Sequence, residues 1–171
     1  FVALQLALRL AETQLGKLQG QGLPEGVEGD ENIAGADLVP GLEVDALKGA
    51  PGLRSARYAS APDATDADRR EKLLQELEDH PTPWTARFRC VAALANPQGE
   101  VYTAEGTCAG QIIPEGRGIH GFGYDPIFLV LAKGRTMAEL TLEEKNEVSH
   151  RARAIKKLVP QLERLLETKR L

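Results

Sequence analysis

The feature that most constrains the fold is a run of three strand candidates in the middle of the chain. They cover Thr85–Leu94, Val101–Gly106 and Thr107–Ile113. Between the first two lies Asn96-Pro-Gln-Gly99, a sequence typical of a tight turn. Because strands joined by short turns run in opposite directions beside each other, the run predicts an antiparallel meander.

Other segments add strands and helices before this meander. Gly41–Leu47 alternates apolar and acidic residues with a period of two, as a half-buried strand does, and Lys48–Gly52 then breaks the pattern. Asp66 is a candidate N-cap for a helix through Asp79, with three leucines on one face, and His80–Pro83 ends that helix. Phe1–Leu18 is rich in Leu and Ala without a regular polar face, so strand and helix both stay open there.

Two capping boxes mark helix starts in the last third of the chain. In Thr136-Met-Ala-Glu139 and Thr141-Leu-Glu-Glu144, the hydroxyl and the acid three residues later satisfy free backbone N–H groups. We expect a helix from about Leu142 to Val159, with Pro160 as a possible kink. Helices and strands without strict alternation indicate an α/β or α+β protein.

Composition bounds the class of protein. A chain of 171 residues, 42% hydrophobic and 27% charged, can bury one core, so we expect a single domain over 1–171. No stretch reaches the roughly 18 to 20 apolar residues of a membrane span, which favours a soluble cytoplasmic protein. A net charge of −4 argues against binding a nucleic acid backbone. Cys90 and Cys108 lie outside any CxxC pattern and read as buried thiols.

The segment most informative about chemistry is Gly116-Arg-Gly-Ile-His-Gly-Phe-Gly-Tyr-Asp-Pro126. Glycine lets a backbone lie close to a flat ligand, on which Phe122 or Tyr124 could stack. Asp125 could then accept a hydrogen bond from a ring N–H. A glycine-rich turn with its aromatic side chains in the core explains the pattern equally well.

A second segment, Glu144–Arg151, brings several polar side chains together on a predicted helix. Lys145 and Ser149 share a face, whereas His150 and Arg151 point away from it. A ligand would therefore have to meet this helix at an angle or near an irregular end. Taken alone, a charged and solvated helix face is the better explanation.

Considered together and in order, these segments resemble the inosine/xanthosine triphosphate pyrophosphatase family. The matching segments are Gly41–Leu47, Gly49–Gly52, Ser55–Tyr58, Gly121–Pro126, Glu139-Leu140, Glu144-Lys145 and Ser149–Arg151. The resemblance implies an elongated α/β fold of two lobes around a long mixed β-sheet, with a nucleotide cleft between the lobes, and a homodimer. It also implies a house-cleaning hydrolase that cuts non-canonical purine nucleoside triphosphates (ITP, dITP, XTP) to the monophosphate and pyrophosphate, with Mg²⁺ as cofactor.

Carried over residue by residue, the resemblance implies that Phe122 stacks on the base and that later residues select a 6-keto purine. The C6 oxygen of such a base accepts hydrogen bonds from Lys, His or Arg, whereas the adenine amino group would leave those donors unpaired. The implied substrate-binding residues in this part of the chain are Phe122, Gly123, Tyr124, Asp125, Lys145, His150 and Arg151.

The N-terminal motifs depart from the family pattern. Its Ala-Asp-Asp-Ser-Gly-Leu segment reads Ala36-Asp-Leu-Val-Pro-Gly-Leu42 here, so Asp37 remains as the candidate catalytic base and metal ligand. Glu31 is a second implied metal ligand. Lys17 lies in Thr13-Gln-Leu-Gly-Lys17, which resembles a shortened form of the family's triphosphate-binding loop. Three explanations compete: a truncated or rearranged pseudoenzyme, an active enzyme with unusual local chemistry, and a sequence whose first 40 or so residues are incomplete or misread. The third is favoured.

Two other functions stay open. A non-catalytic purine-nucleotide-binding homologue would keep the base-recognition residues and release no pyrophosphate. A structural α/β domain whose loops are only turns would bind no purine triphosphate.

Overall fold

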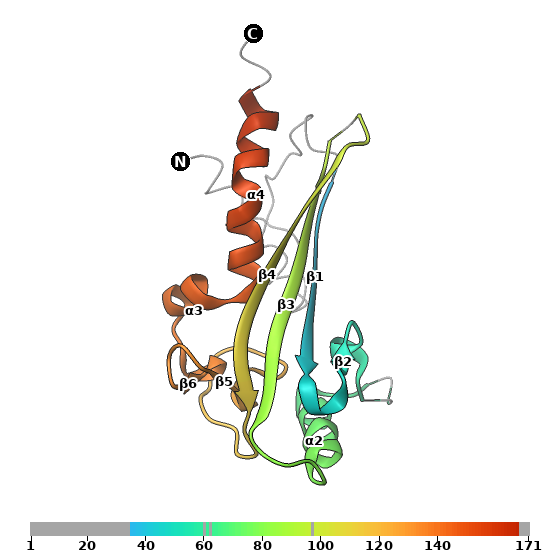
Figure 1. Cartoon of the computed structure of the whole chain (residues 1–171), viewed down its shortest axis with the longest axis vertical. Coiled ribbons are helices and arrows are strands. Elements are labelled where there is room, and N and C mark those ends of the chain that lie inside the picture. Colours follow the sequence, from blue (N-terminus) through green and yellow to red (C-terminus); the bar gives the residue numbers. More distant parts are fainter. Residues whose placement is uncertain (1–34, 60, 62, 97, 168–171) are drawn as a thin grey trace. The chain divides into compact units, whose positions relative to one another are not determined.

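The structure, a computed structural model, describes residues 35–59, 61, 63–96 and 98–167. A six-stranded sheet in the order β2-β1-β3-β4-β5-β6 forms its framework (Figure 1). The strands are β1 Gly35–Val44, β2 Pro51–Gly52, β3 Trp84–Ala95, β4 Val101–Ile112, β5 Phe128–Val130 and β6 Arg135–Thr136. The helices are α2 Asp66–Leu77, α3 Leu142–Val148 and α4 His150–Glu167, and four short 3₁₀ turns, η1 Asp45–Leu47, η2 Ser55–Arg57, η3 Asp125–Ile127 and η4 Met137–Glu139, complete the described elements.

The described strands confirm the α/β expectation and the predicted turn between β3 and β4. At that turn the Asn96 N–H donates to the Glu100 carbonyl at 3.0 Å, and the Asn96 side-chain oxygen accepts from the Glu100 N–H at 2.9 Å. The pairs β1–β2, β4–β5 and β5–β6 are also antiparallel. These three pairs show none of the parallel pairing that the mixed sheet implied by the resemblance would contain.

One strand, β4, replaces the two that were predicted on either side of Gly106. Gly106 lies inside β4 and does not end it. A Cβ at this position would overlap the carbonyl oxygen of His150 and the backbone nitrogen of Ala154 in α4. The glycine thus serves close approach of a helix to a continuous strand, a use that a lone glycine in a strand pattern often has.

The chain divides into two compact units that we describe separately. Among the described residues, the glycine-loop unit comprises those of 40–89 and 107–149, and the terminal-helix unit comprises those of 35–39, 90–106 and 150–167. β1, β3 and β4 each supply residues to both units.

The glycine-loop unit has the larger core. Leu42 and Val44 of β1, Leu73 and Leu77 of α2, and Phe128 of β5 are all fully buried in it. The Phe88 and Phe128 rings lie with their centroids 4.3 Å apart. Trp84 is buried at the start of β3, and its indole N–H donates to the His80 carbonyl at 2.9 Å.

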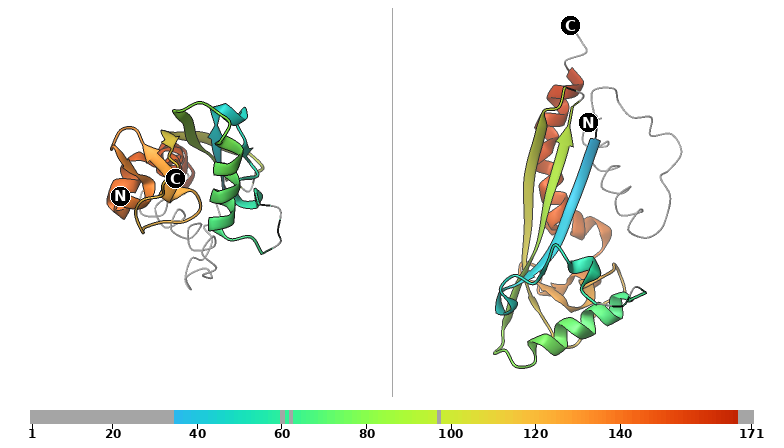
Figure 2. Two further views of the ribbon diagram at one scale, coloured as in Figure 1. Left: turned by 90° about the horizontal axis from the view of Figure 1, so that it is seen from below. Right: turned by 90° about the vertical axis from the view of Figure 1, so that its right-hand side faces the viewer.

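In the terminal-helix unit, α4 packs along β3 and β4 (Figure 2). Buried Ala154 lies against Cys90 and Ala92, and Leu162 lies against Leu94. Small residues at the first contact let the helix come close to the sheet, and larger side chains fill the space further along α4. No helix in the described residues combines the length and the apolarity needed to cross a membrane.

The helix boundaries differ from prediction at three points. Thr65, not Asp66, is the N-cap of α2, because its hydroxyl accepts from the Asp68 N–H within a capping box. α2 ends at Leu77, before the expected Asp79. The predicted helix 142–159 is two helices, because Ser149 adopts an extended conformation (φ −66°, ψ 147°) between α3 and α4. Pro160 lies inside α4.

The Gly106 contact predicts a large effect of a small substitution. We expect Gly106→Ala to lower the free energy of unfolding by about 1–3 kcal/mol, because the new methyl group would force the backbone of α4 away from β4. Gly116→Ala is the matched control, since its Cβ would lie 3.3 Å from the Pro126 Cβ and meet no backbone atom closely. Equal urea midpoints for the two variants would contradict this account of Gly106.

Candidate functional site

The glycine-rich segment forms a loop that is closed by its own backbone and by neighbouring turns. The Arg117 N–H donates to the Pro126 carbonyl at 2.9 Å, and the His120 N–H donates to the Ala138 carbonyl at 2.9 Å. Gly121 has φ +99°, and a Cβ there would overlap the Asp125 carboxylate. Glycine at 121 therefore allows both the turn and the position of Asp125.

The two aromatic residues of this loop have different environments. Tyr124 is 5% exposed within the core of the glycine-loop unit, and its hydroxyl donates to the Ser55 carbonyl at 3.0 Å. Burial raises the pKa of that hydroxyl above its ordinary value. Phe122 is only half-buried. Of the two rings, Phe122 is the one with surface left for stacking.

Asp125, three residues after Phe122, forms an ion pair with Lys145 of the same unit. Lys145 Nζ lies 2.9 Å from Asp125 Oδ2, and the two side chains are 18% and 13% exposed. Lys145 Nζ also donates to the His120 carbonyl at 3.5 Å. An acceptor and a donor held side by side match a ligand edge that carries an N–H next to a carbonyl oxygen, as a 6-keto purine does at N1 and C6.

Helix α3 holds Lys145 in place through its first turn. The Thr141 hydroxyl accepts from the Glu144 N–H, and the Glu144 carboxylate accepts from the Thr141 N–H at 3.0 Å. Arg135 also donates to Glu144. The hydrogen bond from Arg135 lowers the pKa of Glu144, and the hydrogen bond from the Thr141 N–H lowers it further. The Glu144 carboxylate that caps the helix is therefore ionised at neutral pH.

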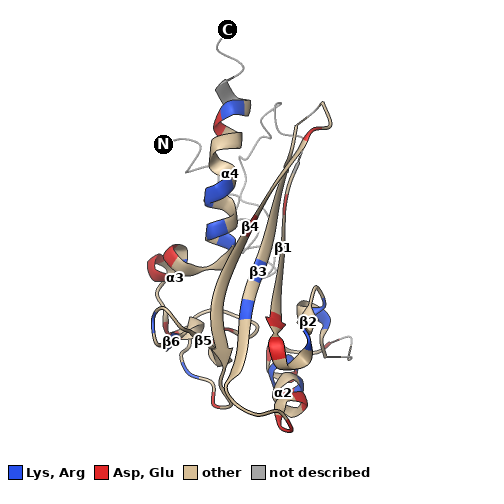
Figure 3. Cartoon of the chain, in the orientation of Figure 1, with Lys and Arg blue, Asp and Glu red and all other residues tan. Residues whose placement is uncertain are grey.

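His150 and Arg151 begin α4 and belong to the terminal-helix unit. His150 is 3% exposed. Burial, with a smaller contribution from the Arg151 charge, holds the pKa of His150 well below its ordinary value. The imidazole is therefore neutral and carries one N–H donor and one acceptor nitrogen. Basic residues continue along the first turns of α4: Arg151, Arg153, Lys156 and Lys157 (Figure 3).

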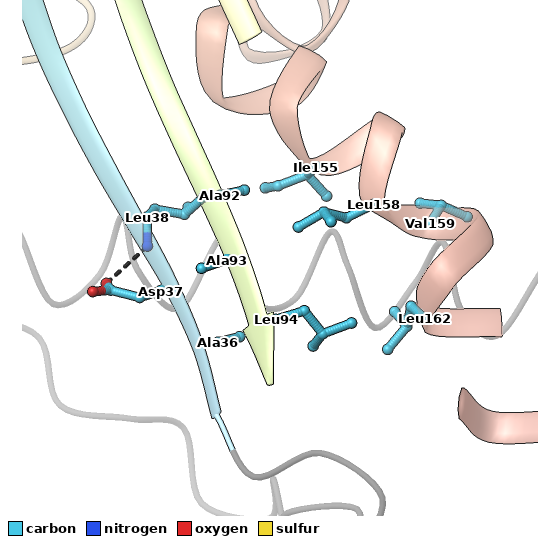
Figure 4. A pocket seen from close by; sticks show the side chains of 10 residues that line it. All are labelled: Ala36, Asp37, Leu38, Ala92, Ala93, Leu94, Ile155, Leu158, Val159 and Leu162. Carbon is cyan, nitrogen blue, oxygen red and sulfur yellow. Dashed lines mark hydrogen bonds between the residues drawn. The ribbon is translucent and has the colours of Figure 1, made fainter. Parts of the chain in front are cut away.

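Asp37 lies on β1 at the rim of a small apolar cavity in the same unit. Its carboxylate is exposed and accepts from the Leu38 N–H at 2.8 Å, turned away from the α4 side chains (Figure 4). The cavity of about 50 Å³ is otherwise bounded by apolar residues: Ala36, Leu38, Ala92, Ala93, Leu94, Ile155, Leu158, Val159 and Leu162. Such a lining suits neither phosphate nor metal, so any phosphate chemistry of Asp37 belongs to its exposed side.

The two cysteines are free and buried, as the sequence predicted. Burial raises the pKa of the Cys90 thiol to about 11, even though the Arg151 charge acts in the opposite direction. A buried thiol with a raised pKa is a poor nucleophile at neutral pH, which fits a packing role for Cys90.

The described residues contain no group of three His, Cys, Asp or Glu side chains able to hold a metal. Of the two implied ligands, Glu31 lies outside the described residues, as does the phosphate-binding candidate Lys17. Asp37 offers a single exposed carboxylate. Because Mg²⁺ in nucleotide sites is commonly held by one or two carboxylates together with substrate phosphates and water, this donor fits the ion.

The structure thus brings Phe122, Asp125 and Lys145 together in one unit and places Asp37, His150 and Arg151 in the other. Sequence reasoning missed two residues of α2 that contact the loop. The Asp66 carboxylate accepts from the Gly123 N–H, and the Arg70 guanidinium donates to the Gly123 carbonyl. No local pattern signals these contacts, because helix and loop lie far apart in the sequence.

The fold and these residues define a class of protein: an α/β protein in which a closed glycine loop carries an Asp–Lys ion pair. The chain belongs to the Ham1 family, whose family model matches residues 40–161. It is similar to the dITP/XTP pyrophosphatase of Desulforamulus reducens, with 54% identity over 126 residues, covering 73% of this chain and 62% of the relative. The corresponding protein of Halalkalibacterium halodurans is 54% identical over 121 residues, covering 69% and 61%. The chain therefore spans a little over three fifths of these relatives.

Solved structures agree with this family. A HAM1 protein from Coxiella burnetii matches with a TM-score of 0.71 and 42% identity, covering 75% of this chain and 66% of that one. The Staphylococcus aureus Ham1 protein matches with a TM-score of 0.70 and 42% identity over the same shares.

The buried His150 predicts a specific pH dependence of stability. At pH values above 6.5, its ordinary pKa, the imidazole is neutral in both the folded and the unfolded chain. As the pH falls below 6.5, the unfolded chain takes up a proton that the folded chain does not, so stability falls by at most about 1.4 kcal/mol per pH unit. We expect His150→Gln to flatten the dependence of urea-unfolding stability on pH between pH 6.5 and 5. A wild-type slope in His150→Gln would refute the burial argument.

Proposed function

We propose that this chain hydrolyses non-canonical purine nucleoside triphosphates, namely ITP, dITP and XTP, to the monophosphate and pyrophosphate. The observation that carries the proposal is the Asp125–Lys145 pair, held at 2.9 Å in the unit that presents the half-buried ring of Phe122. The names of the two relatives given above, dITP/XTP pyrophosphatase, support the same activity.

Base selection follows from the polarity of the pair. Asp125 accepts a hydrogen bond and Lys145 donates one, so an N1–H next to a C6 oxygen satisfies both side chains. Adenine presents the reverse polarity, with an acceptor at N1 and an amino group at C6. It would leave a partly buried charge without a partner, and such mismatches reduce reaction with the wrong substrate by up to about 10⁴-fold.

The roles of the remaining residues stand as part of this proposal. Gly123 and Tyr124 shape the base loop, neutral His150 and Arg151 assist in binding the substrate, and Lys17 binds phosphate. Asp37, with Glu31, would hold Mg²⁺, and Asp37 is the candidate base for the attacking water. When bound, Mg²⁺ supplies charge neutralisation on the phosphates and lowers the pKa of a coordinated water.

We further propose that residues 1–171 act as a single domain within a homodimer in the cytoplasm, as the resemblance implies. The net charge of −4 favours free nucleotides over nucleic acid as the substrate. The nucleotide cleft implied by the resemblance belongs to the same proposal.

A non-catalytic purine-nucleotide-binding homologue is the second candidate. One observation favours it: residues 35–59, 61, 63–96 and 98–167 hold no group of three or more His, Cys, Asp or Glu side chains placed to bind a metal. This homologue would bind inosine triphosphate and release no pyrophosphate.

Pyrophosphate release from ITP and from ATP, with and without Mg²⁺, tests the proposed activity. We expect Mg²⁺-dependent turnover of ITP, little turnover of ATP, and loss of turnover in Asp37→Asn. Lys145→Met should lower kcat/KM for ITP by about tenfold to a hundredfold, because it removes the donor to the C6 oxygen. Lys133→Met is the matched control, since Lys133 pairs with Glu147 at the surface of the same unit.

Three results would decide against parts of the proposal. Binding of ITP without pyrophosphate release selects the non-catalytic homologue. Equal turnover of ITP and ATP removes the base-selection argument. An equal loss of activity in Lys133→Met and Lys145→Met removes the specific role of Lys145.

A further inference from the structure

Helix α2 holds the glycine loop at both sides of one residue. Asp66 Oδ2 accepts from the Gly123 N–H at 2.6 Å, and Arg70 Nη1 donates to the Gly123 carbonyl at 2.7 Å. The two peptide groups that flank the Gly123 Cα are therefore each bound by a charged side chain. Hydrogen bonds to charged groups are stronger and shorter than those between neutral groups.

The Asp66 side chain has a second partner that holds it. Arg69 pairs with Asp66 at 2.6 Å and also donates to the Ala64 carbonyl at 2.7 Å. Thr65 caps the helix directly before Asp66. Leu73 and Leu77, about one and two turns after Arg70, are fully buried and anchor α2 in the core. Asp66 and Arg70 therefore both belong to a helix that is held by the core.

Gly123 is the residue of the loop that the two α2 side chains hold. Its φ is +59°, and no heavy atom outside Gly123 and its two chain neighbours lies within 4 Å of the position that a Cβ would take. Packing therefore does not restrain this residue, and its backbone flexibility is the greatest of any residue type. On the C-terminal side Tyr124 is fixed by burial and by Ser55. On the other side lies Phe122, whose carbonyl accepts from the Asp125 N–H at 3.1 Å, so Gly123 lies inside the turn that joins Phe122 to Asp125.

We propose that Asp66 and Arg70 are positioning residues that set the direction of the Phe122 ring relative to the Asp125–Lys145 pair. This inference rests on the proposed function, because it assigns Phe122 to the purine base. Neither residue is catalytic, since each acts through the Gly123 backbone. We call the two hydrogen bonds from Asp66 and Arg70 to Gly123 the clamp. The clamp keeps the Phe122 ring and the Asp125–Lys145 pair in one arrangement before the base binds, so binding does not have to order the loop.

Steady-state kinetics with ITP provide the first test. Arg70→Met should raise KM by about tenfold and change kcat by less than about twofold, because a disordered loop weakens base binding. Arg70→Lys should recover part of the lost affinity, since an ammonium group supplies one donor to the Gly123 carbonyl. Arg164→Met, the same change at an exposed position of α4, should match the wild type. A fall in kcat with unchanged KM in Arg70→Met would overturn the proposal.

Amide hydrogen exchange in the nucleotide-free protein separates this inference from the proposed function. The Gly123 amide should exchange at least about tenfold faster in Asp66→Ala and in Arg70→Met than in the wild type. Glu71→Ala, which removes an exposed acid of α2, is the control and should leave this amide unchanged. Unchanged exchange in both test variants, with wild-type thermal stability, refutes the clamp. Faster exchange in a protein that hydrolyses no ITP would instead refute the proposed function alone.

Discussion

The alternation of buried and exposed residues along β3 is the constraint on which the rest of the structure depends. Every second side chain from Trp84 to Leu94 is buried, and the same strand serves two cores. Trp84, Ala86 and Phe88 pack in the glycine-loop unit, and Cys90, Ala92 and Leu94 pack in the terminal-helix unit. A slip of one residue in its register would turn all six side chains to the opposite face, so β3 fixes both cores at once.

The Asp125 and Lys145 side chains of the candidate site are carried by short elements. Lys145 stands on a helix of seven residues, whose start is fixed by Thr141 and Glu144. Asp125 begins a single 3₁₀ turn. Neither element would be stable alone, because helix nucleation is unfavourable at such lengths. Their stability comes from buried neighbours such as Val148 and Ile127, which links the chemistry of the pair to the core beneath it.

Much of this could be predicted from the sequence, and the failures have physical reasons. The hairpin at Asn96, the capping boxes at Thr136 and Thr141, and the buried cysteines follow from local patterns. The break at Ser149 and the continuity of β4 through Gly106 do not. At Gly106 the reason is the close approach of the α4 backbone, a tertiary contact that has no local signal. The contacts of Asp66 and Arg70 with the loop are likewise set by tertiary packing, for which a single sequence carries no periodic signal.

The position of Trp84 has a practical consequence for spectroscopy. It is the only tryptophan among the 171 residues, and it lies in the core of the glycine-loop unit with its indole N–H bonded to His80. Emission excited at the red edge of the absorption band therefore comes from that unit alone. Far-ultraviolet circular dichroism, in contrast, receives a strong contribution from α4. Melting curves recorded by the two signals can therefore be compared to test whether the two units unfold together.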